Sequence, residues 1–191
     1  MSQEQTSKST VASTFKYEGD DVYIDSTSRI KNPSSVSLGN HVAIDMGVYI
    51  STSAEIGDYV HIAPYTCVIG GVDSFLKMGA FSGISAGSKI LCGSDDFTDG
   101  LMNPQVPIEY RSPKITTVTF EPFSCVGVNC VVMPGVTLGE GSVVGANSVV
   151  TSDTMPWTVY VGSPARPVKR RNKERIIENA NKLGYGGDRN V

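Results

Sequence analysis

The sequence lacks several features by which common protein classes are recognised. It contains no run of about 18 apolar residues, so we expect no transmembrane helix. Lys and Arg number 16 against 19 Asp and Glu, and this balance argues against a general nucleic-acid binder. The first ten residues are polar and lack the apolar centre of a signal peptide. We therefore expect a cytoplasmic protein.

Cysteine and histidine are scarce as well. The four cysteines are Cys67, Cys92, Cys125 and Cys130. They form no Cys-x-x-Cys pair, which argues against a zinc knuckle or a redox pair, and we expect free thiols. Only two histidines are present, whereas a catalytic zinc takes three protein ligands. We therefore expect no metal site.

Leucine is rare among the apolar residues, which bears on the fold class. The sequence has 6 Leu against 23 Val and 13 Ile, together with 20 Gly. Branched residues favour strands, and leucine is the residue that an amphipathic helix would use. The 191 residues are enough for one domain with a core of its own. We expect that domain to be mostly β, with many turns.

An aliphatic residue recurs every six positions over most of the chain. Three blocks of the period begin at Leu38, Met78 and Phe120, and together they hold fifteen hexads. A small or β-branched residue stands four places after each aliphatic one, from Val42 through Val72 in the first block. The phase slips by four residues near 74–77, and residues 95–119 carry no pattern. Neither a helix nor a single strand has a period of six, so each hexad predicts a short strand followed by a turn.

The motifs LGNHVA, IGDYVH, IAPYTC and VGVNCVVMPGVTLGEGSVVGANSVV resemble the hexapeptide-repeat acyltransferases, in particular their sugar O- and N-acetyltransferases. The resemblance implies a left-handed parallel β-helix in which three hexads make one triangular coil. It also implies a homotrimer with active sites between neighbouring prisms. We expect a polar N-terminal segment at 1–20, the β-helix at 21–165 with an inserted loop at 95–119, and a basic C-terminal segment at 166–191. Within the last segment, residues 171–183 predict a short helix with Ile176, Ile177 and Leu183 on one side.

His61 is the candidate catalytic base. It ends the hexad IGDYVH, where we expect a turn and an outward side chain. In the acetyltransferases that this stretch resembles, a histidine at this place takes a proton from the acceptor. The alternative is a surface histidine without a role, and we assign that reading to His41. A backbone N–H near Ser82–Gly83 or in a facing coil is the candidate oxyanion donor.

The inserted loop carries the candidate residues for sugar binding, which are Asp95, Asp96, Tyr110 and Arg111. Asp95 or Asp96 would either orient His61 or hydrogen-bond sugar hydroxyls. The alternative for the same residues is an Asx-turn at the start of the loop. The loop has no histidine, so it cannot supply the base that many sugar acetyltransferases of this type carry there.

Acetyl-CoA is the donor that the resemblance implies. Small residues in the later coils would let its apolar arm lie close to the backbone, although tight corners need small residues in any case. The candidates are Gly127, Gly145 and Ala146. Six cations lie within residues 166–175, and such groups recognise phosphate. Of these, Lys169 and Arg170 are the candidate contacts to the nucleotide end of the donor. The alternative is a solvated basic start of a helix.

The sequence thus predicts an acetyl-CoA-dependent acetyltransferase that acts on a sugar hydroxyl or amino group in surface polysaccharide or lipopolysaccharide biosynthesis. Two alternatives remain at this point. One is an N-acetyltransferase of a nucleotide-linked amino sugar, and the other is a non-enzymatic β-helix scaffold, because a fold does not determine a function.

Overall fold

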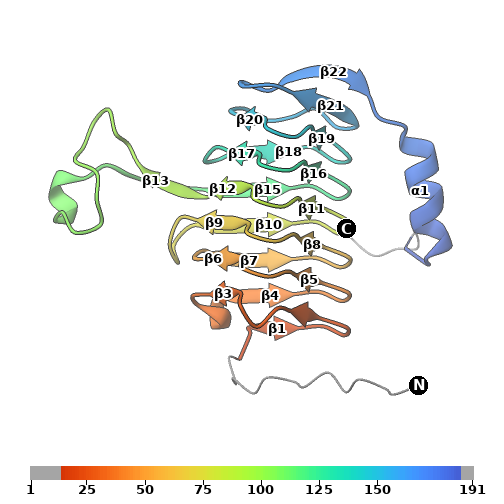
Figure 1. Cartoon of the computed structure of the whole chain (residues 1–191), viewed down its shortest axis with the longest axis horizontal. Helices are drawn as coiled ribbons and strands as arrows, with labels where there is room; N and C mark the ends of the chain where they lie inside the picture. Colours follow the sequence, from red (N-terminus) through yellow and green to blue (C-terminus); the bar gives the residue numbers. More distant parts are fainter. Residues whose placement is uncertain (1–13, 186–191) are drawn as a thin grey trace.

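The chain folds as a left-handed parallel β-helix with one C-terminal α-helix, as the computed structural model shows (Figure 1). The structure describes residues 14–185. Residues 1–13 and 186–191, which hold most of the expected polar N-terminal segment and the end of the C-terminal tail, lie outside that range. Among the described residues, no helix has the length and apolar character needed to cross a membrane.

Three parallel sheets form the faces of a triangular prism. The first face has the strand order β1-β4-β7-β10-β15-β18. The second has β2-β5-β8-β11-β16-β19-β21-β22, in which only β22 runs antiparallel. The third has β20-β17-β12-β9-β6-β3. Each strand pairs with the strand of the next coil, so neighbouring strands on a face are distant in sequence.

The strands are short, as the hexads predict. On the first face they are β1 (Tyr17–Glu18), β4 (Val36–Leu38), β7 (Ser53–Ile56), β10 (Phe75–Met78), β15 (Thr117–Phe120) and β18 (Thr137–Leu138). On the second they are β2 (Tyr23–Ile24), β5 (Ala43–Ile44), β8 (His61–Ile62), β11 (Gly83–Ile84), β16 (Cys125–Val126), β19 (Val143–Val144), β21 (Thr158–Val161) and β22 (Arg166–Arg170). On the third they are β3 (Arg29–Ile30), β6 (Tyr49–Ile50), β9 (Cys67–Ile69), β12 (Lys89–Leu91), β17 (Val131–Val132) and β20 (Val149–Val150).

The core is the inside of the prism. The aliphatic residues of all fifteen hexads, from Leu38 to Val150, are buried there. The pattern predicts that the residue four places after each aliphatic one also points inward, and these residues are buried except for Val72, which is 50% exposed, and Ser94, which is half-buried. The four-residue insertion lies in the corner after β9, so Val72 projects from the widened turn. The fully buried Ser74 follows that turn, and its hydroxyl donates to the carbonyl of Gly70.

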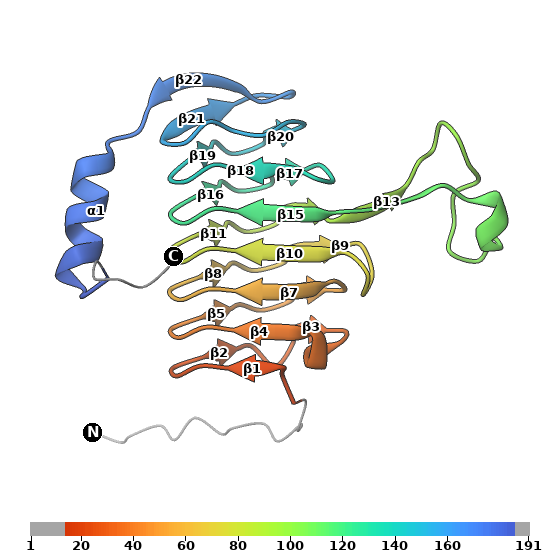
Figure 2. The same cartoon turned by 180° about the vertical axis from the view of Figure 1, so that it is seen from behind.

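The inserted segment leaves the prism as a long arm, which Figures 1 and 2 show on the side opposite the helix. Its base is an antiparallel pair, β13 (Gly93–Asp95) with β14 (Pro113–Ile115). A 3-10 turn, η2 (Ile108–Tyr110), lies farther out, and a second one, η1 (Pro33–Ser35), precedes β4. Regular coils resume at β15, two residues before the predicted end of the loop.

A stack of rings fills the corner between the first and second faces. The coils place His41, Tyr59, Phe81, Phe123 and Trp157 there, each with a positive φ, and Gly141 occupies the corner of the coil between those of Phe123 and Trp157. Neighbouring ring centroids are 4.5, 4.8, 5.2 and 6.0 Å apart. A positive φ is strained for such residues, and the contact between rings offsets part of that strain.

The C-terminal helix α1 (Lys173–Lys182) runs beside the prism (Figure 1). It is shorter than predicted. Asn172 caps its start by accepting from the N–H of Arg175 at 3.1 Å. Ile176 and Ile177 are half-buried, whereas Ala180 is the buried residue and Leu183 is exposed. Leu183 therefore does not belong to the packed side, because the helix has already ended at Lys182.

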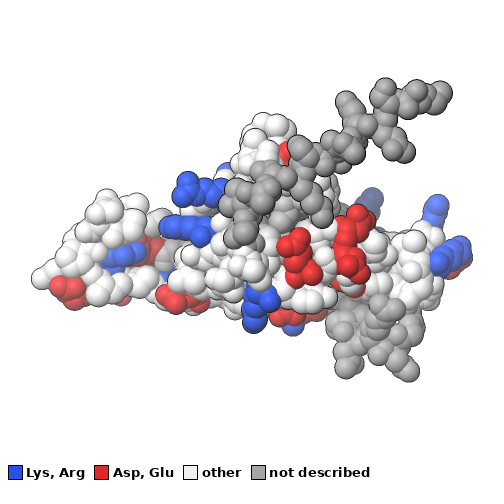
Figure 3. Space-filling view, turned by 90° about the horizontal axis from the view of Figure 1, so that it is seen from below, with Lys and Arg blue, Asp and Glu red and all other residues white. Residues whose placement is uncertain are grey.

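Charge is distributed unevenly along the prism. The last coil carries the cations of β22. The first coil carries both signs of charge: Glu18, Asp20, Asp21 and Asp25 with Lys16, Arg29 and Lys31. Figure 3 shows Asp and Glu side chains near the middle of this end of the molecule, with Lys and Arg side chains on either side.

Candidate active site

His61 lies on the outer side of the second face. It is the first residue of β8 rather than a turn residue, so the predicted turn is wrong, while the predicted outward side chain is confirmed at 57% exposure. The next residue, Ile62, points into the core and is fully buried. Strand alternation therefore directs the imidazole to solvent. His61 pairs in register with Ala43 of β5 on one side and with Gly83 of β11 on the other.

Asp45 is the carboxylate that holds the imidazole. Its Oδ2 lies 2.7 Å from His61 Nε2. Asp45 follows β5 directly, so it comes from the preceding coil, and its side chain is 30% exposed. With Nε2 bound to Asp45, Nδ1 is the ring nitrogen left to accept a proton. A carboxylate that fixes the orientation and tautomer of an imidazole in this way is a recurrent part of histidine bases.

The loop carboxylates are paired within the arm. Asp95 Oδ1 accepts from Arg111 Nη2 at 2.8 Å, and Asp96 Oδ2 pairs with Lys114 Nζ at 2.7 Å. These partners hold the pKa of both carboxyl groups below the ordinary range. The structure therefore corrects the expectation that Asp95 or Asp96 orients His61, since that carboxylate is Asp45.

The Asx-turn, which the sequence offered as the alternative at the start of the loop, is present. Asp96 Oδ1 accepts from the N–H of Thr98 at 3.0 Å, which is the Asx-turn expected of this segment. Arg111 is 19% exposed and lies against Asp95, whereas Tyr110 is exposed in η2. Of the four loop candidates, Tyr110 therefore has its side chain in solvent, and sugar binding by this set stays a prediction.

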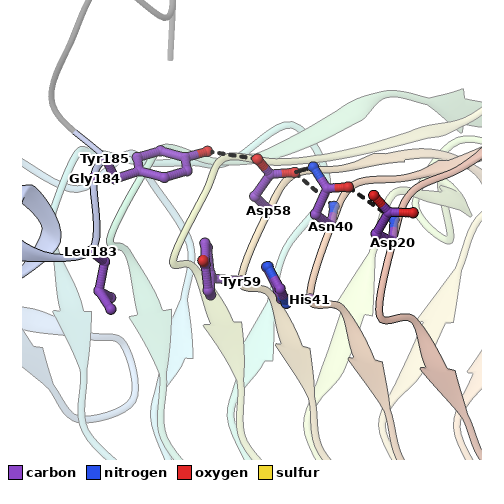
Figure 4. Close-up of a pocket in the computed structure, with 8 residues that line it drawn as sticks. All are labelled: Asp20, Asn40, His41, Asp58, Tyr59, Leu183, Gly184 and Tyr185. Carbon is purple, nitrogen blue, oxygen red and sulfur yellow. Dashed lines mark hydrogen bonds between the residues drawn. The ribbon is translucent and has the colours of Figure 1, made fainter.

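His41 belongs to a different part of the molecule from His61. Its Nδ1 lies 2.9 Å from Asp21 Oδ2, and its ring stacks on Tyr59. It occupies the corner beside a hollow of about 350 Å³ that Figure 4 shows. The polar groups there bond mainly to each other: Asp58 accepts from Asn40 Nδ2 at 3.2 Å and from the Tyr185 hydroxyl at 3.2 Å.

The expected oxyanion donors near Ser82–Gly83 are engaged in the fold. The N–H of Gly83 donates to the carbonyl of Ser124 at 3.0 Å, and the N–H of Ser82 donates to the carbonyl of Gly79 at 3.2 Å. Both groups belong to the backbone hydrogen bonds of the coils. The N–H groups of Ser82 and Gly83 are therefore not free to hold an oxyanion, and a donor in a facing coil stays a prediction.

The small residues predicted for the donor lie on the same side of the prism as His61. Gly127 and Gly145 follow β16 and β19, and Ala146 is exposed at the next corner. A Cβ on Gly127 would come within 2.7 Å of the backbone nitrogen of Ala146. Close stacking of coils thus explains Gly127 without a ligand, and donor binding at these residues stays a prediction.

The basic segment divides into two groups. Arg171 is structural: its Nη1 donates to the carbonyls of Phe123 at 2.6 Å and Gly141 at 3.0 Å, and its guanidinium lies over Trp157. Lys169 and Arg170 are exposed in β22, although Arg170 Nη1 approaches Thr158 Oγ1 at 3.4 Å. These two remain the candidates for phosphate binding.

The described residues contain no group of three His, Cys, Asp or Glu side chains placed to hold a metal ion. All four cysteines are free thiols, as predicted. Cys92 is fully buried, and burial raises its pKa to about 12. Burial also raises the pKa of Cys125 and Cys130. Two histidine–carboxylate pairs, His61 with Asp45 and His41 with Asp21, are thus the solvent-exposed groups suited to acid–base chemistry among the described residues.

Comparison with known proteins identifies the family of the chain. The model for bacterial transferase hexapeptide (six repeats) matches residues 35–70 and 118–152. A dTDP-4-amino-4,6-dideoxy-D-glucose acyltransferase of Escherichia coli is 33% identical over 179 residues, covering 91% of this chain and 92% of that protein. A putative lipopolysaccharide biosynthesis O-acetyl transferase of E. coli K12, WbbJ, is 30% identical over 155 residues, covering 76% of each.

A solved structure agrees over nearly the whole prism. AntD, an N-acyltransferase from Bacillus cereus solved in complex with dTDP and 3-hydroxybutyryl-CoA, has a TM-score of 0.85 and 35% identity. The match covers 88% of this chain and 89% of that one. The chain therefore belongs to the hexapeptide-repeat acyltransferase family, in its sugar-acyltransferase branch.

Proposed function

We propose that this acyltransferase moves an acyl group from a coenzyme A thioester to the amino group of a nucleotide-linked amino sugar, a building block of surface polysaccharide. The observation that carries the proposal is the outward His61–Asp45 pair on the second face. The E. coli acyltransferase is named for such a substrate, and a variant of AntD was solved in complex with dTDP-4-amino-4,6-dideoxyglucose and coenzyme A, which favours the amine over a hydroxyl as acceptor.

The reaction needs little from the protein beyond alignment and a base. The amine nitrogen attacks the thioester carbonyl, the C–N bond forms, and the C–S bond breaks. His61 Nδ1 takes the proton that the nitrogen loses and returns it to the leaving thiolate, so that an amide and free coenzyme A result. Asp45 holds Nε2–H throughout.

The donor would lie along the second face above His61, with its phosphates toward β22. Lys169 and Arg170 are the exposed cations there. Acetyl-CoA is the simplest such donor, and acyl-CoA and nucleotide sugars are cytoplasmic metabolites, so we place the reaction in the cytoplasm. We also propose a homotrimer, because the arm at 93–115 carries apolar side chains that the single chain leaves exposed.

Substitution of His61 tests the base. We expect His61→Ala to lower kcat by about 10²–10⁴ while acetyl-CoA still raises the unfolding temperature. The assay uses acetyl-CoA with dTDP-4-amino-4,6-dideoxyglucose and follows release of the thiol. His41→Ala is the matched control, because it removes the other histidine–carboxylate pair and should leave kcat unchanged. Full activity of His61→Ala would exclude His61 as the base.

Sugar O-acetylation is the second candidate, supported by the resemblance to WbbJ over 76% of the chain. The product distinguishes the two, because an ester is cleaved by mild base and an amide survives. A base-labile product would favour the hydroxyl acceptor. A chain that neither binds acetyl-CoA nor acetylates either acceptor would instead fit a scaffold.

A further inference from the structure

Gly83 is a glycine that the fold does not require. Each of the other described glycines either has a positive φ or lies so close to a neighbour that an added Cβ would come within 3.0 Å of it. At Gly83 the backbone is ordinary β, and an added Cβ would meet only the carbonyl oxygen of His61, at 3.6 Å. Glycine weakens a strand, and within one it often marks a place where another group approaches closely.

Its position is directly beside the proposed base. Gly83 pairs in register with His61 on β8 and with Cys125 on β16. The next residue, Ile84, is buried, so a side chain at position 83 would project outward, parallel to the imidazole. The missing side chain leaves a notch on the second face, one strand above His61.

The two sides of His61 differ in polarity. Below it lie Asp45, Ala43 and then Tyr23, whose hydroxyl donates to Asp25 at 3.2 Å. Above the notch, the outward residues of successive strands are half-buried and apolar: Cys125, Val143 and Val159. Carboxylates and hydroxyls suit a sugar, whereas the apolar side suits the arm of an acyl thioester.

The distance from the notch to the cations of β22 also matches the length of the donor's arm. Val159 pairs with Lys169 of β22, so four strand spacings separate the notch from the exposed cations. At about 4.8 Å for each spacing this distance is about 19 Å, the reach of an extended pantetheine arm. A donor with its phosphates at Lys169 would bring its thioester to Gly83.

We propose that the notch at Gly83 holds the acyl group of the donor, and that Gly83 is the residue that sets the size of acyl group the enzyme accepts. The inference rests on the proposed function and adds to it a specificity determinant. Filling the notch with one methyl group should exclude longer acyl chains while an acetyl group still fits.

The first experiment measures donor binding without acceptor. Calorimetry gives the Kd of acetyl-CoA, propionyl-CoA and butyryl-CoA for the wild type, Gly83→Ala and Gly83→Val. We expect Gly83→Ala to raise the ratio of the butyryl-CoA Kd to the acetyl-CoA Kd at least tenfold, since one methylene in a closed pocket is worth about 10–200-fold. Its unfolding temperature should equal or exceed that of the wild type, because alanine suits a strand better.

The second experiment repeats the series as kcat/KM with the amino sugar as acceptor. Ala43→Val is the matched control, because it adds bulk on the other side of His61. We expect it to raise the acceptor KM and leave the preference among donors unchanged. An acceptor KM that rises in Gly83→Ala, with the donor ratios unchanged, would overturn the proposal by placing the sugar in the notch.

The two proposals can fail separately. Donor ratios that do not respond to Gly83→Ala in an active enzyme would overturn the role of the notch and leave the proposed function standing. Donor ratios that do respond, in a protein that acylates no amino sugar, would overturn the proposed function and support the notch.

Discussion

At the scale of single residues, Arg171 shows how one member of a basic cluster becomes structural. Its guanidinium satisfies the carbonyls of Phe123 and Gly141 and covers Trp157, where the chain leaves β22 for α1. Its neighbours Lys169 and Arg170 point into solvent. Sequence alone shows six similar cations, and their roles separate only when their partners are known.

Arg171→Ala should therefore lower stability, whereas Lys169→Ala should lower donor affinity. Hydrogen bonds to a charged group are worth about 1.5–3 kcal/mol, and we expect a loss of that size for Arg171→Ala in denaturant unfolding. Lys169→Ala should unfold like the wild type but raise the KM for acetyl-CoA. The assignment would be contradicted if Arg171→Ala unfolded like the wild type and raised only the donor KM.

At the scale of elements, the arm formed by residues 93–115 depends on two ion pairs for its shape. Asp95 with Arg111 and Asp96 with Lys114 join its two strands at the base. The Asp95 side chain is 9% exposed, so this pair is shielded from solvent. The antiparallel pairing of β13 with β14 accompanies these contacts, so backbone hydrogen bonds and ion pairs hold the same part of the arm.

Stability of the arm should depend on pH in the acid range. The ion pairs lower the pKa of Asp95 and Asp96 below the ordinary value of 3.8. The pairs therefore stabilise the arm above pH 3.8, and the stabilisation disappears as the pH falls through the lowered pKa values. We expect pepsin to cut within the arm faster at pH 1.5 than at pH 4.5, when each rate is divided by the rate on an unfolded peptide substrate at the same pH, with sites read by mass spectrometry.

The double variant Asp95→Asn with Asp96→Asn supplies the control. Its normalised cutting rates should be similar at both pH values, because it has no carboxylates left to protonate at these positions. If the normalised rates of the wild type were equal at both pH values, the ion pairs would not stabilise the arm.

At the scale of the whole molecule, the single chain exposes more apolar surface than its prism requires. Phe97, Leu101, Met102, Ile108 and Tyr110 of the arm are each at least 58% exposed. Apolar groups gathered on a projecting element usually meet a partner. A second copy of the chain is the partner that fits our proposal of a homotrimer.

Sedimentation equilibrium tests the assembly. We expect a single species of three times the 20.3 kDa chain mass. Replacing residues 96–112 by a short glycine-containing turn should shift the protein toward smaller species while the prism still folds, since the coils before and after the arm pair directly through β12 and β17. A wild type that sediments at 20.3 kDa would exclude the trimer.

Much of the fold could be predicted from the sequence because its repeat is local. Every hexad from Leu38 to Val150 places its aliphatic residue inside the prism. The insertion was located to within a few residues, and the error at Val72 arose because a widened corner and a phase slip look alike in sequence. His61 could be identified as an outward histidine in the same way.

The partners of His61 could not be predicted, because they depend on how one coil stacks on the next. Asp45 lies 16 residues before His61, nearly one coil of 18, and this spacing was the available signal. The sequence points to Gly83 only as a backbone donor, whereas its lack of close neighbours in the structure is what supports the proposed notch. The sequence by itself determined the repeat, most of the buried set and the outward position of His61, because these follow from periodicity. Only the tertiary structure decided which carboxylate meets His61, which cation is structural and which glycine has no close neighbour, because each depends on residues from different coils.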